Sequence, residues 1–115
     1  MQNIEIAVGK DDRLIGHLFP AEPAWRKGRS VIVGPATAVP QTFYYNFCRY
    51  LAGHGFDVLT FDFRSVGQSK LRPIRDYADI GFSSWAEQDY PAVIEWMHAH
   101  HEGQPLYIVG HSVGG

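Results

Sequence analysis

Three short runs of apolar and β-branched residues, spaced far apart along the chain, constrain its fold more than any other feature. They cover Val31–Val33, Phe56–Phe61 and Leu106–Val109. Runs of this kind, bounded by turn residues, are typical of strands that are covered on both faces. The segments between them are long enough for the crossover helices that parallel strands require. The sequence therefore predicts an α/β fold with a mainly parallel sheet.

The first part of the chain has a different pattern, in which apolar and polar residues alternate. Ile4–Val8 and Leu14–Leu18 both alternate in this way, and the turn-like segment Gly9–Asp12 separates them. Alternation with a period of two is typical of a strand with one buried face. We therefore expect an antiparallel pair of half-buried strands ahead of the parallel part.

The segment Gln41–Ala52 has the apolar periodicity of a helix that packs on a sheet. Gly53 and Gly55 follow it and are expected to end the helix. The predicted buried stripe consists of Phe43, Phe47, Tyr50 and Leu51.

A second helix is predicted between Ser84 and Gly103. Ser84 and Glu87 have the spacing of a capping box, which places the start of the helix at Ser84. Pro91 lacks an N–H group, so it is expected to kink this helix or to lie in a 3₁₀-like first turn.

Charge and composition exclude several classes of protein. The net charge of −2 lacks the basic excess of proteins that bind nucleic acid. We find no apolar run long enough to span a bilayer and no secretory leader pattern, so we expect a soluble, cytoplasmic protein without a membrane partner. Cys48 is the only cysteine, which excludes an internal disulfide and favours a buried, packed thiol.

One motif carries chemistry. Gly110–Gly114 reads G-H-S-V-G, which satisfies G-x-S-x-G, and it follows the Leu106–Val109 run directly. A sharp turn from strand to helix exposes the serine hydroxyl, and the flanking glycines let the two backbones approach closely. The position of the motif predicts that Ser112 is a nucleophile, whereas a serine in a glycine turn without such a strand is usually only a turn former.

Three segments together resemble the α/β-hydrolase superfamily. Gly110–Gly115 is similar to its nucleophile elbow, Asp62–Ser69 resembles its D-x-R-G-x-G-x-S loop, and Val31–Pro35 occupies the position of its oxyanion strand. Uncharacterised bacterial hydrolases of this superfamily are the most similar, because Gly34–Thr37 reads G-P-A-T where other members have His-Gly. The resemblance implies the N-terminal part of an α/β-hydrolase fold, with a structural role for the Asp62–Ser69 loop.

The resemblance also implies the groups that stabilise the oxyanion. One donor is the backbone N–H of the residue after the nucleophile, here Val113. The second comes from the loop after the oxyanion strand, here Ala36 or Thr37, because Pro35 has no N–H to donate. No cofactor and no metal ion is implied.

In this family the triad acid and the histidine base follow the nucleophile in sequence. No residue follows Gly115, so we expect residues 1–115 to form an incomplete α/β-hydrolase domain that is inactive alone. His111 adjoins Ser112 but its side chain should diverge from the hydroxyl. His98, His100 and His101 lie at a helix end, too far away for a base, and lack the spacing of a zinc site.

Three functions remain in competition at this point. The first is a serine hydrolase that acts on a small-molecule ester, thioester or amide through an acyl-enzyme on Ser112, and transfer of the acyl group to another acceptor is equally open. The second is a non-catalytic half-domain that self-associates through its exposed sheet edge. The third, a nucleotide-binding domain, lacks the G-x-G-x-x-G pattern that it requires.

Overall fold

The computed structural model describes residues 1–36 and 39–111. Within these ranges, the strands form one sheet in the order β1-β2-β4-β3-β5. β1 pairs with β2 and β2 with β4 in antiparallel fashion, whereas β3 pairs with both β4 and β5 in parallel. The predicted antiparallel pair followed by parallel strands is confirmed. The strands are β1 (Gln2–Val8), β2 (Asp12–Phe19), β3 (Arg29–Gly34), β4 (Phe56–Phe61) and β5 (Leu106–Gly110).

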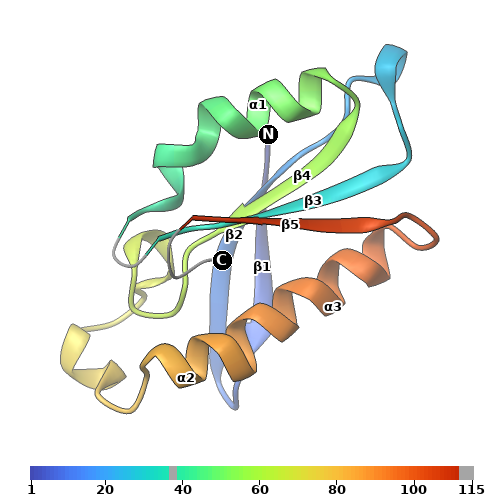
Figure 1. Cartoon of the computed structure of the whole chain (residues 1–115). Helices are drawn as coiled ribbons and strands as arrows, with labels where there is room; N and C mark the ends of the chain where they lie inside the picture. The colour runs from blue at the N-terminus through green and yellow to red at the C-terminus, as the bar shows by residue number, and fades with distance from the viewer. Residues whose placement is uncertain (37–38, 112–115) are drawn as a thin grey trace.

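Helices cover both faces of the sheet. Figure 1 shows α1 on one face and the run from α2 to α3 on the other. The helical segments are η1 (Pro23–Trp25), η2 (Gln41–Tyr44), α1 (Tyr45–Gly53), η3 (Gly67–Ser69), η4 (Ile74–Tyr77), α2 (Phe82–Ser84), η5 (Trp85–Asp89) and α3 (Tyr90–His100). The sequence of β3 and β4 is apolar at successive positions because each face meets its own helix layer.

The two faces carry separate hydrophobic clusters. On the α3 side, Ile32 and Leu59 pack with Val93 and Met97 of the helix. On the α1 side, Val31, Val33 and Val58 pack with residues of η2 and α1, including Tyr44, Cys48 and Ala52. Burying an aliphatic side chain of this size contributes about 1.5–3 kcal/mol, so the clusters fix β3 and β4 as the rigid centre of the sheet.

The predicted buried stripe of the first helix is wrong at three positions. Phe43, Phe47 and Tyr50 are exposed at 68%, 41% and 61%. The helix instead turns Cys48 and Ala52 toward the sheet, and Leu51 packs at the edge of the same cluster. The small side chains let the helix lie close to β4, and the 3₁₀ turn of η2 sets the rotation of the helix that follows. The buried residues of η2 and α1 are Gln41, Tyr44, Cys48 and Ala52.

The start of the second helix also differs from the prediction. The helix begins at Phe82 after Gly81, and Ser84 has helical backbone angles instead of capping the end. The Ser84 hydroxyl accepts a hydrogen bond from the Gly81 N–H at 3.4 Å, so it satisfies the helix start from the third position. Pro91 lies in the first turn of α3, and the segment before it, η5, is a π-helical turn and not the 3₁₀-like turn that was one of the expectations.

Cys48 is fully buried against the sheet, as the sequence predicted. Burial raises the pKa of its thiol to about 12, and the nearby Arg49 offsets only part of this effect. Such a thiol is protonated and unreactive at neutral pH.

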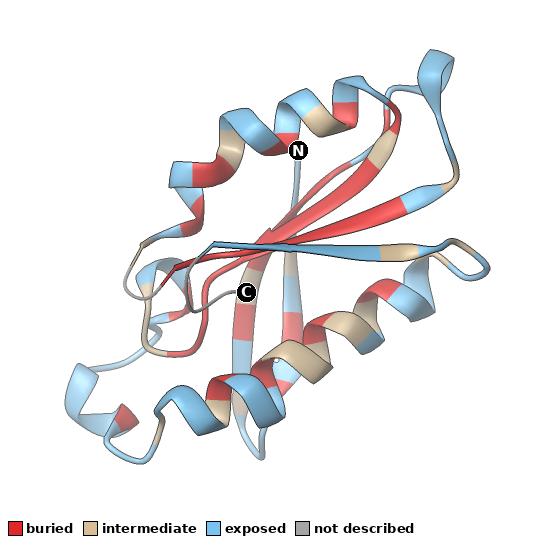
Figure 2. Ribbon diagram, viewed as in Figure 1, coloured by how far each residue is buried: buried red, intermediate tan, exposed pale blue. Residues whose placement is uncertain are grey.

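β5 lies at the edge of the sheet and is much less covered than its neighbours. In Figure 2, β3 and β4 are coloured as buried, whereas β5 is mostly coloured as exposed. Tyr107, Ile108 and Val109 are 48%, 47% and 42% exposed. Residues 1–36 and 39–111 contain no helix long and apolar enough to cross a membrane.

Candidate active site

Segments distant in sequence meet at one edge of the sheet because β3, β4 and β5 run parallel. Gly34 ends β3 and lies opposite Gly110, the last residue of β5. The N–H of His111 donates to the Gly34 carbonyl at 3.1 Å, which extends this pairing by one residue. The loop after β3 and the segment that leads into the G-x-S-x-G motif are therefore neighbours. This edge is where open parallel sheets place ligands.

The predicted nucleophile Ser112 and the predicted oxyanion donor Val113 lie outside the described residues, as does Thr37. Their roles stay predictions. His111, directly before Ser112, is described and exposed. Its Nδ1 lies 2.8 Å from the hydroxyl oxygen of Tyr44, and its ring stacks on Phe43 with a centroid distance of 6.5 Å.

Ala36, the other expected oxyanion donor, lies in the loop after β3 and is buried. Its N–H donates a hydrogen bond to the Tyr44 hydroxyl oxygen at 2.9 Å. The group therefore already has an acceptor in this structure and could serve an oxyanion only by sharing or breaking that bond. Its role as a donor stays a prediction.

Tyr44 is the residue of this edge that sequence analysis missed. Its hydroxyl contacts both Ala36 and His111, although it belongs to η2 and was not part of the predicted apolar stripe. A tyrosine in a helical segment is usually interpreted as core, and its ring is indeed buried in the α1-side cluster. The contacts of the hydroxyl with Ala36 and His111 depend on how the fold brings separate segments together, which no local sequence pattern encodes.

Asp62, which directly follows β4, joins two loops of this edge by hydrogen bonds. The side chain is fully buried, and its Oδ1 accepts the Gln41 N–H at 2.7 Å while its Oδ2 accepts the Gln68 N–H at 2.9 Å. Burial raises the pKa of Asp62, and the hydrogen bonds from Gln68 and Gln41 offset part of that effect. Gly67 must be glycine here, since a Cβ would lie 2.6 Å from Oδ2 and its φ is +49°.

Arg64 of the same loop forms a buried ion pair with Asp89 of η5. Its Nε lies 2.7 Å from Asp89 Oδ1, and its backbone N–H donates to Oδ2 at 2.9 Å. The Arg64 Nη2 also donates to the Gln88 side chain at 2.6 Å. These contacts confirm that the Asp62–Ser69 loop ties other segments together. Ser65, which takes a glycine position of the family loop, has a φ of +73°.

His17 of β2 reaches this edge, because its Nε2 lies 2.7 Å from the Gln68 side-chain oxygen of the Asp62–Ser69 loop. The histidines at the end of α3 lie away from it. His100 and His101 end α3, one strand length from Gly110, because β5 runs from near them to the opposite side of the sheet. The His100 Nδ1 bonds the Trp96 carbonyl at 2.8 Å, and His101 lies 3.9 Å from Asp57. In the part of the chain that the structure describes, no three His, Cys, Asp or Glu side chains gather as metal ligands.

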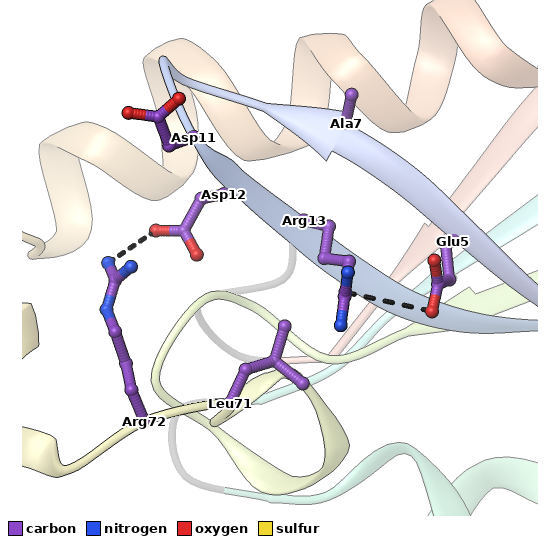
Figure 3. A pocket seen from close by; sticks show the side chains of 7 residues that line it. All are labelled: Glu5, Ala7, Asp11, Asp12, Arg13, Leu71 and Arg72. Atoms are coloured by element: carbon purple, nitrogen blue, oxygen red, sulfur yellow. Dashed lines mark hydrogen bonds and ion pairs between the residues drawn. The ribbon is translucent and has the colours of Figure 1, made fainter.

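A surface hollow of about 540 Å³ lies beside the β1–β2 hairpin, and none of its lining residues belongs to the candidate site. Figure 3 shows Arg72 facing Asp12 and Arg13 facing Glu5, whereas no dashed line joins Asp11 to the other side chains drawn. Arg72 lies 2.8 Å from Asp12, and Arg13 lies 3.7 Å from Glu5. Because both arginines already face a carboxylate, the hollow offers no unpaired cation for an anionic substrate.

Comparison with known proteins places the fold in a family. A family model described as the alpha/beta hydrolase fold matches residues 34–115. A lidless α/β serine hydrolase from Xanthomonas campestris is 23% identical, with a TM-score of 0.77 over 98% of this chain and 51% of its own. A serine hydrolase homologue from Coxiella burnetii is 20% identical, with a TM-score of 0.74 over 98% and 52%. A carboxyl esterase from Bacillus coagulans is 18% identical, with a TM-score of 0.80 over 98% and 36%.

The chain spans about half the length of the first two of these structures. No curated protein sequence matches it. The shared fold covers nearly the whole chain, and the family match includes the loop after β3, the Asp62–Ser69 loop and the G-x-S-x-G motif. The chain belongs to the alpha/beta hydrolase fold family.

Proposed function

We propose that this chain is the nucleophile-bearing part of a serine hydrolase that forms an acyl-enzyme on Ser112. The observation that carries the proposal is the position of the G-x-S-x-G motif. It follows β5 directly, at the edge where β3 also ends and where Ala36 and His111 meet around Tyr44. A serine at that point of an α/β-hydrolase sheet is the one that the fold uses for nucleophilic catalysis.

The proposed reaction needs a base to activate the serine. A histidine from outside residues 1–115 takes the Ser112 proton as the hydroxyl oxygen attacks the carbonyl carbon of the substrate. The N–H of Val113 and an N–H of the loop after β3 stabilise the oxyanion. The intermediate then expels the protonated leaving group and leaves an acyl-serine, which water hydrolyses with the same histidine as base.

Substrate class follows from this chemistry. The acyl-serine can be formed from a small-molecule ester, thioester or amide, and a second alcohol or amine in place of water would make the protein an acyltransferase. The likeness in fold to a carboxyl esterase supports ester cleavage as the first activity to assay. The proposed chemistry uses side chains and backbone groups alone, with no cofactor and no metal ion.

Covalent labelling tests the proposal. A fluorophosphonate probe is applied to the complete polypeptide encoded by the gene and, separately, to residues 1–115. We expect an adduct on Ser112 in the complete polypeptide, lost in Ser112→Ala and retained in Ser83→Ala, a matched change at an exposed serine of α2. We expect residues 1–115 alone to remain unlabelled, because the serine lacks its base. An unlabelled complete polypeptide would contradict the proposal.

A second function is favoured by the exposed face of β5. Among the described strands β5 pairs only with β3, and an apolar hollow of about 350 Å³ lies where Tyr107 and Val109 meet Val31, Leu51 and Phe56. An uncovered apolar edge strand favours association with another strand. On this proposal, residues 1–115 act as a non-catalytic half-domain that pairs with a second copy through β5.

Sedimentation velocity separates the two functions. Self-association through β5 predicts a dimer of the 12.9 kDa chain that Ile108→Lys dissociates. Phe82→Lys, at an exposed apolar residue of α2, should leave the dimer intact. A monomer at all concentrations, with labelling of Ser112 in the complete polypeptide, would remove the half-domain function.

A further inference from the structure

The Tyr44 hydroxyl is the point at which two segments of the candidate site are joined. Ala36, in the loop after β3, donates its N–H to the Tyr44 oxygen at 2.9 Å. His111, which directly precedes Ser112, has its Nδ1 at 2.8 Å from the same oxygen. Tyr44 is only 7% exposed, so both bonds are shielded from solvent on the tyrosine side.

The direction of the Ala36 bond is fixed by its donor. A backbone N–H can only donate, so the Tyr44 oxygen is the acceptor toward Ala36. Toward His111, the hydroxyl donates to Nδ1 when the imidazole carries its proton on Nε2, and it accepts from the Nδ1–H in the other tautomer. In both tautomers the Tyr44 hydroxyl joins Ala36 to His111.

Tyr44 is itself held in place from several sides. Its segment η2 begins at Gln41, whose N–H is bound by the buried Asp62. The Gln41 amide also donates to the Ile15 carbonyl of β2 at 2.9 Å. Phe43 stacks on the His111 ring with an interplanar angle of 10°, while the Tyr44 ring meets it edge-on at 74°. The imidazole is therefore bracketed by two consecutive side chains of one anchored segment.

We propose that Tyr44 is a positioning residue, which fixes the loop after β3 relative to the nucleophile turn. The inference rests on the proposed serine hydrolase function and deepens it. Acyl transfer requires the nucleophile and the oxyanion donors to be held within a fraction of an ångström, and Tyr44 bonds a residue on each side.

Kinetics of the complete polypeptide test the role of the hydroxyl. Tyr44→Phe keeps the ring and removes both hydrogen bonds. We expect kcat for a p-nitrophenyl ester to fall about tenfold, with KM changed less than twofold, since the loss concerns alignment and not substrate contact. The matched control is Tyr45→Phe. Tyr45 is the next residue, at the start of α1, and its hydroxyl is hydrogen-bonded to neither Ala36 nor His111, which both bond Tyr44. This control should keep kcat.

Nitrogen-15 NMR of the histidine side chains gives a readout that does not depend on turnover. We expect the His111 Nδ1 resonance of the wild-type protein to carry the signature of a hydrogen bond and to shift in Tyr44→Phe, in whichever tautomer the ring adopts. Should Tyr44→Phe not fold, His111→Gln removes the same bond from its other partner and should lower kcat to a similar extent.

The outcomes separate the two proposals. Unchanged kcat in a folded Tyr44→Phe protein, or a His111 Nδ1 resonance that the substitution does not shift, would overturn the assignment of Tyr44 while labelling of Ser112 stood. Absence of Ser112 labelling in the wild-type protein would overturn the hydrolase function and with it the catalytic role of Tyr44, even if NMR found the Tyr44–His111 bond.

Discussion

The ion pair between Arg64 and Asp89 gives the sharpest test of how the Asp62–Ser69 loop is held. The side chains are 4% and 0% exposed, and Asp89 accepts hydrogen bonds from both the Nε and the backbone N–H of Arg64. Asp89→Asn preserves the shape of the side chain but leaves the guanidinium charge without a counter-charge in a buried position. Breaking one side of a buried pair costs about 3–5 kcal/mol, a large share of the 5–15 kcal/mol by which most proteins are stable.

Urea unfolding followed by tryptophan fluorescence measures this change, because Trp85 donates its indole N–H to the Arg64 carbonyl at 3.2 Å. With a denaturant slope of about 2 kcal/mol per molar urea, the midpoint should fall by about 1.5–2.5 M. The matched control is Glu5→Gln, which also exchanges a carboxylate for an amide. Glu5 pairs with Arg13 at the surface, and the two side chains are 63% and 54% exposed, respectively. Exposed pairs contribute about 0–1 kcal/mol, so its midpoint should move by less than about 0.5 M.

The double variant Arg64→Met with Asp89→Leu completes the test. Removing both charges leaves no unpaired buried charge and costs only the neutral bond from the Arg64 backbone N–H, so this variant should be more stable than Asp89→Asn alone. If the urea midpoint of Asp89→Asn lay within about 0.5 M of the wild-type midpoint, as expected for the control, the buried pair would contribute no more to stability than a surface pair. That result would contradict the prediction.

Two further predictions concern single residues. Ser65→Gly should stabilise the protein by about 0.5–1 kcal/mol, since a φ of +73° strains a residue with a Cβ, and a lower melting temperature for the variant would contradict this. Burial raises the pKa of Cys48 to about 12, so stability is full below the unfolded thiol's pKa of about 8.5 and falls as pH rises toward 12. Cys48→Ala should lack this loss in alkaline urea titrations, and an equal loss in both proteins would show that the thiol is not its source.

Much of the fold was predictable because strand and helix periods are local properties of the sequence. The runs that became β3, β4 and β5 carry apolar residues toward both faces, and the alternation in β1 and β2 matches their antiparallel pairing. Spacing alone cannot choose between two apolar stripes on one helix. Phe43, Phe47 and Tyr50 are larger than Cys48 and Ala52, but the close approach of the helix to β4 favours the two small side chains.

The candidate site was predictable only where a motif is contiguous in sequence. The G-x-S-x-G motif and the Asp62–Ser69 loop could be recognised because their residues adjoin one another. The bond between Tyr44 and His111 joins positions 67 apart, and that between Gln41 and Asp62 joins positions 21 apart. Such contacts follow from the strand order, in which β3 lies between β4 and β5, and not from any local pattern.

Trapping the covalent intermediate is the most direct test of whether Ser112 forms an acyl-enzyme. The complete polypeptide is mixed with p-nitrophenyl acetate, quenched in acid during turnover, digested and mapped by mass spectrometry. Acyl-enzyme formation predicts an acetyl group on Ser112, absent from Ser112→Ala and present in Ser83→Ala. Release of p-nitrophenol by the wild-type protein with the acetyl group on another residue, or with none on Ser112, would contradict it.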